Sequence, residues 1–114
     1  MILSKEQLLQ PMALPTEDID LPQFGGTIRV RAWTGADYDT FGKAVKEFSF
    51  DGSMYAAALA ASAINESGDR LFDMNGDIQR IASTFLKTTL ERTYDVIRRM
   101  NKLGKEGLED AEKN

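Results

Sequence analysis

The sequence predicts an α+β fold, in which an N-terminal β-hairpin packs on a mostly helical body of four to five helices. Residues 17–21 and 27–33 alternate apolar and charged side chains, as half-buried strands do. From residue 34 onward, apolar side chains recur at spacings of three and four, the period of an amphipathic helix. The 114 residues suffice for one domain with its own core. We therefore expect a single domain over residues 1–114, in which the polar tail at 105–114 is a frayed helix or disordered.

A short helix is expected over residues 4–10, ahead of the hairpin. Ser4 can cap its first turn, and Gln7 stands three residues later, which is the spacing of a capping box. Pro11 and Pro15 follow, and proline cannot continue a helix because it lacks a backbone N–H. The helix therefore ends before the first strand.

The hairpin is expected to turn at residues 22–26, where a pair of glycines supplies the positive φ that short loops need. In the second strand, Ile28 and Val30 point to one face and the arginines point to the other. The outer face should therefore bring acidic side chains close to arginines across the strands. These charged residues are Glu17, Asp18, Asp20, Arg29 and Arg31.

Two different kinds of helix are expected after the hairpin. Thr34 caps the first, which has one apolar stripe. The stripe consists of Tyr38, Phe41, Val45 and Phe48. The second helix, over residues 54–64, is apolar on nearly every side and contains six alanines. Such a helix is normally central and buried.

The C-terminal part is expected to hold a turn, a short extended stretch at residues 70–72 and an apolar-striped segment from Asp77 to Leu103. Ser83 and Thr84 leave open whether that segment is one helix or two. Gly104 is expected to end it, because glycine readily adopts the left-handed conformation that closes many helices.

Composition excludes several kinds of chemistry. The chain has no Cys and no His, so disulfides, Ser-His-Asp and Cys-His catalytic sets and the commonest metal ligand are ruled out. No apolar run approaches the roughly 18 residues of a membrane span, and the N-terminus lacks the pattern of a secretory signal. We therefore expect a cytoplasmic protein with no membrane partner.

The net charge of −4 is unevenly placed along the chain. Residues 1–76 carry −5, residues 77–103 carry +3 and residues 104–114 carry −2. An acidic body with one basic helix argues against a nucleic-acid-binding domain. It favours docking to other proteins, including head-to-tail association into a homo-oligomer.

Motifs that resemble ligand sites have simpler explanations. Residues 73–77 contain a calcium-loop-like run of acids, but the glycine comes fourth instead of sixth, so a turn is favoured. Nothing in the sequence suggests burial of the acidic pairs that stand two residues apart, and on a helix such residues are not neighbours, so we expect them on the solvated surface. These are Asp37 with Asp39 and Asp18 with Asp20. Residues 24–26 lack the lysine and the helix of a phosphate loop. We expect no enzyme, no cofactor and no metal site.

Six side chains are the candidates for binding a protein partner, because exposed aromatics and arginines dominate protein interfaces. They are Phe24, Arg29, Arg31, Trp33, Arg98 and Arg99. A structural role is the alternative for several of them. Phe24 and Trp33 could lie in the core, and the arginines of the last helix could lie on a face of ion pairs that includes the i,i+4 ladder of Glu91, Asp95 and Arg99.

An ordered set of motifs supports a more specific interpretation. Ser-Lys-Glu-Gln-Leu-Leu at residues 4–9 precedes Leu-Pro-Thr-Glu at 14–17 and the hairpin Leu-Pro-Gln-Phe-Gly-Gly-Thr-Ile-Arg-Val-Arg at 21–31. Thr-Gly-Ala-Asp-Tyr-Asp-Thr-Phe follows at 34–41, where Tyr38 replaces a more usual basic residue. Asn-Glu-Ser-Gly-Asp-Arg-Leu-Phe stands at 65–72 and Met-Asn-Lys-Leu at 100–103. Together they resemble the tail assembly chaperones of long-tailed bacteriophages and prophages.

The resemblance implies a non-enzymatic protein of the host bacterial cytoplasm. Such proteins bind the tape-measure protein, help to recruit tail-tube subunits and are absent from the mature virion. A role of this kind needs an adaptable apolar surface, which we expect from the alanine-rich helix, the methionines and the hairpin aromatics.

Two other functions fit the same sequence. One is a small structural head–tail or minor tail protein that stays in the virion. The other is a small regulator that binds a host protein.

Overall fold

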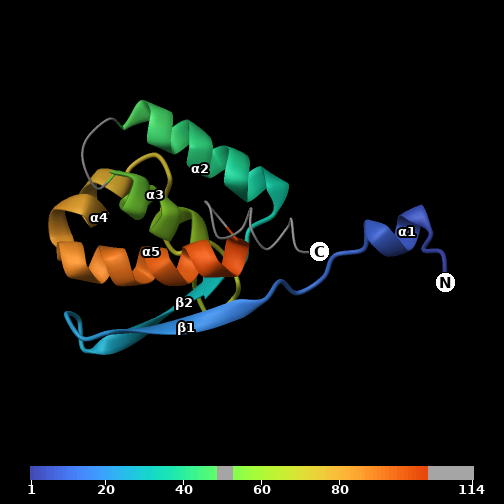
Figure 1. Cartoon of the computed structure of the whole chain (residues 1–114), viewed down its shortest axis with the longest axis horizontal. Helices are drawn as coiled ribbons and strands as arrows, with labels where there is room; N and C mark the ends of the chain where they lie inside the picture. The colour runs from blue at the N-terminus through green and yellow to red at the C-terminus, as the bar shows by residue number, and fades with distance from the viewer. Residues whose placement is uncertain (49–52, 103–114) are drawn as a thin grey trace.

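The computed structural model describes residues 1–48 and 53–102, which form a three-stranded sheet beside a group of helices (Figure 1). The α+β fold expected from the sequence is thereby confirmed. In chain order the elements are α1 (Lys5–Leu8), β1 (Thr16–Leu21), β2 (Gly26–Arg31), α2 (Gly35–Glu47), α3 (Ser53–Ser62), β3 (Ala63–Ile64), α4 (Ile78–Thr84) and α5 (Lys87–Asn101).

The predicted hairpin forms one side of the sheet. Strands β1 and β2 pair antiparallel, with Ile19 opposite Ile28 and Asp18 opposite Arg29. Ile19 and Ile28 are buried together with Leu21, because the period of two places all three on the face that the helices cover. The outer face carries the expected cross-strand pair of Asp18 and Arg29.

Helix α3 is the centre of the body. Its side chains from Ala56 to Ala60 are completely buried, and α2, α4 and α5 all pack against it. Small alanine side chains let three neighbouring helices approach closely, so the prediction of a central, buried helix is confirmed. The predicted end at Ile64 is wrong: α3 stops at Ser62, and the next two residues form β3, which pairs with β2.

The N-terminal arm, residues 1–13, differs from the rest of the chain. The predicted capping box is present in α1, where the Gln7 N–H donates to Ser4 Oγ and the Ser4 N–H donates to Gln7 Oε1. No residue of α1 is buried. Figure 1 shows α1 standing away from the sheet and the other helices. The arm is therefore ordered locally without joining the core.

The last two helices are separated by two residues of extended backbone. Phe85 and Leu86 have extended backbones, so the segment left open by the sequence is two helices, α4 and α5. Helix α5 ends at Asn101, and Lys102 takes the left-handed conformation with φ 51°. The helix therefore ends before Gly104, where the sequence had placed its end. Gly104 and the tail at 105–114 lie outside the described residues.

Within the described ranges, no helix combines the length and apolar character needed to cross a membrane.

Candidate protein-docking surfaces

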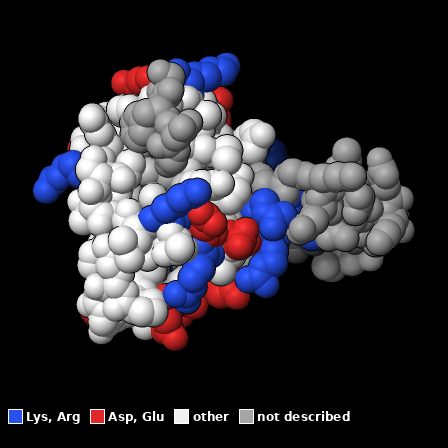
Figure 2. All heavy atoms as spheres, turned by 60° about the vertical axis from the view of Figure 1, so that its left-hand side comes forward, with Lys and Arg blue, Asp and Glu red and all other residues white. Residues whose placement is uncertain are grey.

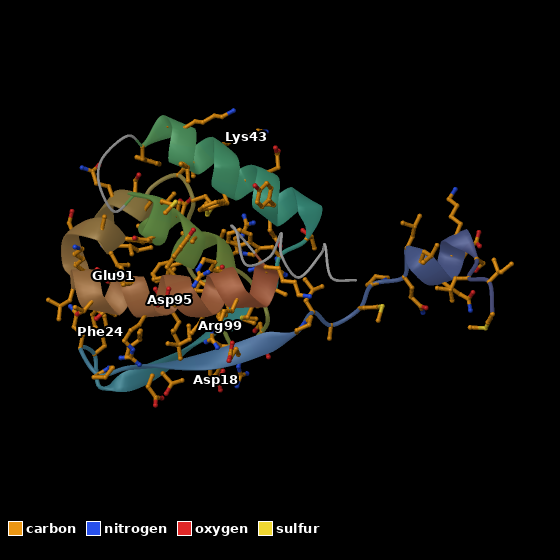
Figure 3. All side chains as sticks on the ribbon, viewed as in Figure 1. Asp18, Phe24, Lys43, Glu91, Asp95 and Arg99 are labelled. Carbon is orange, nitrogen blue, oxygen red and sulfur yellow. The ribbon has the colours of Figure 1, made fainter. Side chains whose placement is uncertain are left out.

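The hairpin tip is fastened to the junction between α4 and α5. The side chain of Gln23 donates to the Thr84 carbonyl at 2.9 Å and accepts from the Leu86 N–H at 2.9 Å. Beside it, the Phe24 ring lies 4.8 Å from the Phe85 ring, centroid to centroid. Figure 3 places Phe24 at this end of the molecule. The tip is therefore held in place while half of Phe24 remains exposed.

A shallow hollow of about 320 Å³ lies next to the tip. Apolar side chains of Phe72, Ile81 and Phe85 line it, and Asp77 and Arg80 supply its charged part. Figure 2 brings this end of the molecule forward and shows a broad uncharged area, with one group of charged side chains to the right of its centre and others along its edges. We call Phe24, Phe85, Leu86 and this hollow the tip surface; its apolar character suits protein docking better than small-ion chemistry.

The outer face of the hairpin carries a surface ion pair. Arg29 Nε lies 2.7 Å from Asp18 Oδ1, and Arg29 Nη2 lies 3.2 Å from Asp18 Oδ2. The hydrogen bond from Arg29 holds the pKa of Asp18 below its usual value. Both side chains are about half exposed, so a partner can reach either one.

A buried carboxylate sits at the opposite end of the hairpin, contrary to expectation. Asp37 is only 5% exposed, and both of its oxygens accept from Arg31 Nη2, at 3.2 and 3.0 Å. Arg70 Nη2 donates to Asp37 Oδ1 at 2.6 Å. The expectation that Asp37 is a solvated surface acid is therefore wrong, because two arginines from other elements enclose it. We call these three residues the arginine cluster.

The charge state of Asp37 follows from opposing causes. Burial by itself would raise the pKa of this carboxyl. The Thr34 backbone N–H, which donates to Asp37 Oδ2 at 3.0 Å, the nearby charge of Arg31 and the hydrogen bond from Arg70 are among the causes that together lower it by more. The net result is a pKa below the ordinary value, so Asp37 is ionised at neutral pH. In the same cluster, Arg31 Nε is buried without a hydrogen-bond partner among the described residues.

Trp33 joins three elements just after β2. Its indole Nε1–H donates to Ser62 Oγ at 2.7 Å, at the end of α3. Its backbone N–H donates to Asn101 Oδ1 at 2.7 Å, at the end of α5. Its ring lies 4.9 Å from that of Phe41 in α2. Trp33 is half-buried, so it takes the structural role that the sequence left as the alternative, and its contact with a partner remains a prediction.

The sequence did not single out a tyrosine cluster that lies across α2, α3 and α5. The rings of Tyr55 and Tyr94 are 4.8 Å apart, and the Tyr94 hydroxyl lies 3.8 Å from Met54 Sδ. Burial raises the pKa of Tyr94. Tyr38 was predicted to join the buried stripe, but it is 57% exposed at the edge of this cluster. The sequence signal that could have indicated this cluster is Tyr55, a large aromatic residue inside an alanine-rich helix.

The two candidate arginines of α5 have different surroundings. Arg98 lies 3.7 Å from Asp95, three residues earlier, so the expected ion pairing on this helix face is present, but with Arg98 and not with Arg99, which the predicted ladder placed opposite Asp95. Arg99 is exposed near the C-terminal end of the helix, as Figure 3 shows. Consecutive residues on a helix point about 100° apart, so the two arginines serve different faces.

The six predicted residues therefore do not form one site. Phe24 lies at the tip, and Arg29 lies on the outer face of the hairpin. The others gather at the far end, because the bond between Trp33 and Asn101 brings the end of β2 to the end of α5. Those residues are Arg31, Trp33, Arg98 and Arg99.

Exposed apolar surface is concentrated in the arm, where the sequence did not place it. Six of the eleven large apolar side chains that are exposed in the described residues lie within residues 1–12. These six are Met1, Ile2, Leu3, Leu8, Leu9 and Met12. The alanine-rich helix cannot supply the adaptable surface expected of it, because α3 is buried by its neighbours.

The calcium-loop-like run is a turn. The Asp73 N–H donates to Asp77 Oδ2, and the Asn75 N–H donates to Asp73 Oδ1, so the acids satisfy local backbone groups. Across residues 1–48 and 53–102, no cluster of three or more acidic side chains is arranged to hold a metal ion.

Comparison with known proteins gives one informative result. No family model matches the chain, and no curated protein sequence matches it. A solved structure of the tail assembly chaperone of bacteriophage HK97 does match, with a TM-score of 0.61. The match covers 89% of this chain and 95% of that one, at 11% sequence identity. The two proteins therefore share a fold, and the fold implied by the sequence motifs is confirmed.

Proposed function

We propose that this chain is a non-enzymatic tail assembly chaperone of a long-tailed bacteriophage or prophage. The observation that carries the proposal is the fold shared with the HK97 tail assembly chaperone over nearly the whole of both chains. The ordered sequence motifs support it independently, because they resemble the same family without reference to the fold. On this proposal the protein acts in the host bacterial cytoplasm and is left out of the mature virion.

The proposed client is the tape-measure protein, and we propose that the arm makes the first contact with it. An apolar client must be covered by apolar surface, and the arm offers the largest supply that the body does not use. Leu8, the last residue of α1, and Leu9, which follows it, are 65% and 72% exposed, and the capping box already orders this helix. A preordered helix loses less conformational entropy on binding than a disordered segment does.

The tip surface is the proposed contact for a second protein, the tail-tube subunit. It lies at the other end of the hairpin from the arm, so one chain can hold both proteins at once. Phe24 is the exposed aromatic anchor there, and Gln23 fixes its position. Self-association is a further part of the proposal, because the acidic body and the basic α5 attract each other between copies.

Co-expression of the full chain with the tape-measure protein tests the proposal. The tape-measure protein is expected to become soluble and to co-purify with the chain. A double Leu8→Ser, Leu9→Ser variant is expected to lose most of this effect, whereas Leu71→Ser, an exposed leucine of the body, keeps it. Circular dichroism confirms that both variants remain folded. A tape-measure protein that stays insoluble with the unaltered chain would contradict the proposal.

The two alternative functions predict different outcomes. Mass spectrometry of purified virions would detect the chain if it were a structural head–tail or minor tail protein. A host protein as the sole specific partner would instead indicate a regulator. Neither alternative has a structural observation in its favour comparable to the shared fold.

A further inference from the structure

Strand β1 forms one edge of the sheet, because the strand order is β1-β2-β3. The Ala32 N–H donates to the Pro15 carbonyl at 2.8 Å, which fixes the alternation of hydrogen bonds along the hairpin. In an antiparallel pair, every second residue bonds to the partner strand and the residues between direct their N–H and C=O the other way. The backbone groups of Thr16, Asp18 and Asp20 therefore point away from β2, toward the outer edge of β1.

This edge is open along most of its length. The Asp20 carbonyl accepts from Arg92 Nη2 of α5 at 3.2 Å. No other described residue bonds to the outward backbone groups of Thr16 and Asp18, and both residues are exposed. A row of unpaired N–H and C=O groups is a template for one more strand.

The side chains of β1 determine what kind of strand can join it. Ile19 and Leu21 lie on the covered face, so a fourth strand would place apolar side chains beside them. Asp18 and Asp20 lie on the open face, where cationic neighbours are favoured. Asp20 and Glu17 form no ion pair with any residue in the described ranges.

The same acids argue against a second copy of β1 as the added strand. Two β1 strands side by side would bring Glu17, Asp18 and Asp20 against the same acids of the other copy, and like charges across strands destabilise pairing. The acids also protect the edge from pairing indiscriminately. A positively charged segment would instead be attracted by the acids of β1.

We propose that the outer edge of β1 binds an extended segment of a partner protein that alternates Lys or Arg with apolar residues, adding it as a fourth strand of the sheet. Main-chain hydrogen bonds to Thr16 and Asp18 hold the segment, and the acids select its charge. This site uses neither the arm nor the tip surface, so it does not depend on the function proposed above.

A short synthetic peptide that alternates lysine and valine is the probe, with a glutamate–valine peptide of the same length as its control. Fluorescence anisotropy with the full chain is expected to show binding of the lysine peptide alone, weakening as salt is added. The peptide is also expected to slow amide hydrogen exchange at Thr16 and Asp18. Binding without that protection would overturn the proposal, because it would mean attraction to the acidic body in general.

Two matched proline variants separate the edge from the rest of the hairpin. Thr16→Pro removes one outward N–H from the first residue of β1, where proline is tolerated, and is expected to weaken binding roughly fivefold. Thr27→Pro makes the same substitution on β2, at a residue that also lies outside the bonded pairs of the hairpin. It removes the hydroxyl that donates to Asp20 Oδ1 but leaves the outward backbone groups of β1 in place, so it is expected to weaken binding much less than Thr16→Pro does. Equal binding by Thr16→Pro and the unaltered chain would contradict the proposal.

A charge variant covers the case in which a proline variant fails to fold. Asp18→Asn with Asp20→Asn leaves the backbone edge intact and is expected to reduce binding of the lysine peptide by about tenfold or more. Far-UV circular dichroism checks that the fold survives. Unchanged binding by this variant would exclude the proposed selection by charge.

Discussion

Helices α1 and α3 are stabilised in opposite ways. Helix α1 has four residues, a complete capping box and no buried side chain. Helix α3 has ten residues, no charged side chain and an almost entirely buried surface. The first exists through local hydrogen bonds, and the second exists because its neighbours cover it. The comparison shows that ordered structure and contribution to the core are separate properties in this chain.

The largest difference is expected from one substitution made in both helices. Leu59→Ala in α3 leaves a cavity at a completely buried site and is expected to lower the free energy of unfolding by about 2–5 kcal/mol. Leu8→Ala in α1 removes an exposed side chain and is expected to cost less than about 0.5 kcal/mol. Chemical denaturation measures both. Equal effects would mean that the arm packs on the body in solution.

Removal of a negative charge is also expected to affect stability differently in the body and in the arm. Asp37→Asn leaves Arg31 and Arg70 without their shared carboxylate and is expected to cost about 3 kcal/mol, because the acid is buried. Glu6→Gln in the arm removes the same charge at an exposed site and is expected to change stability by less than about 0.5 kcal/mol. Urea denaturation at neutral pH compares the two.

The same carboxylate predicts a dependence on pH. The pKa of Asp37 is lower in the folded protein than its ordinary value of 3.8. Its contribution to stability is therefore complete above that value and is lost as the pH falls through it toward the folded pKa. Denaturation curves recorded at stepwise lower pH, starting from about pH 5, are expected to show a larger loss of stability for the unaltered chain than for Asp37→Asn. Equal losses of stability in the two proteins would contradict a lowered pKa of Asp37.

A smaller effect is expected where α3 ends. Trp33→Phe removes the indole N–H that bonds to Ser62 but keeps most of the aromatic ring, so it is expected to cost about 1 kcal/mol. Ser62 still donates to the Ala58 carbonyl in that variant, so it is not left unpaired. A double-mutant cycle with Ser62→Ala isolates the bond. Additive losses would show that the bond contributes nothing.

The smallest pair of effects is expected for the two capping boxes. Thr34→Ala is expected to destabilise the body by about 1 kcal/mol, because α2 packs on the core. Ser4→Ala is expected to unwind α1, seen as a change in amide chemical shifts over residues 4–9, while the denaturation midpoint stays the same. A shifted denaturation midpoint in Ser4→Ala would show that the arm unfolds cooperatively with the body.

Locally determined features were predictable from the sequence. The strands of the hairpin, the caps at Ser4 and Thr34 and the buried alanine-rich helix all follow from patterns within a few residues. The early end of α3 did not follow, because Ala63 and Ile64 leave the helix to pair with β2. Tertiary pairing overrides helix propensity there.

The candidate docking surfaces were less predictable for the same physical reason. The contact between Asp37 and Arg70 could not be predicted from the local sequence, because the two residues are 33 positions apart along the chain. The exposure of the arm could not be predicted either. Leucines are usually buried, and the sequence alone does not show that the core forms without Leu8 and Leu9. Phe24 and Arg29 could be proposed from the sequence because a hairpin fixes which residues stand at its tip and on its outer face.

The bond between Trp33 and Asn101 spans 68 residues, and Gln23 reaches nearly as far along the chain to Thr84 and Leu86. Such contacts cannot form until both ends have been synthesised. At usual translation rates, roughly 3 to 14 s separate the appearance of Trp33 from that of Asn101. During that interval the apolar face of the hairpin lacks α5, the helix that packs against β1. A protein proposed to shield the apolar surface of another is thus itself in need of protection while it is being made.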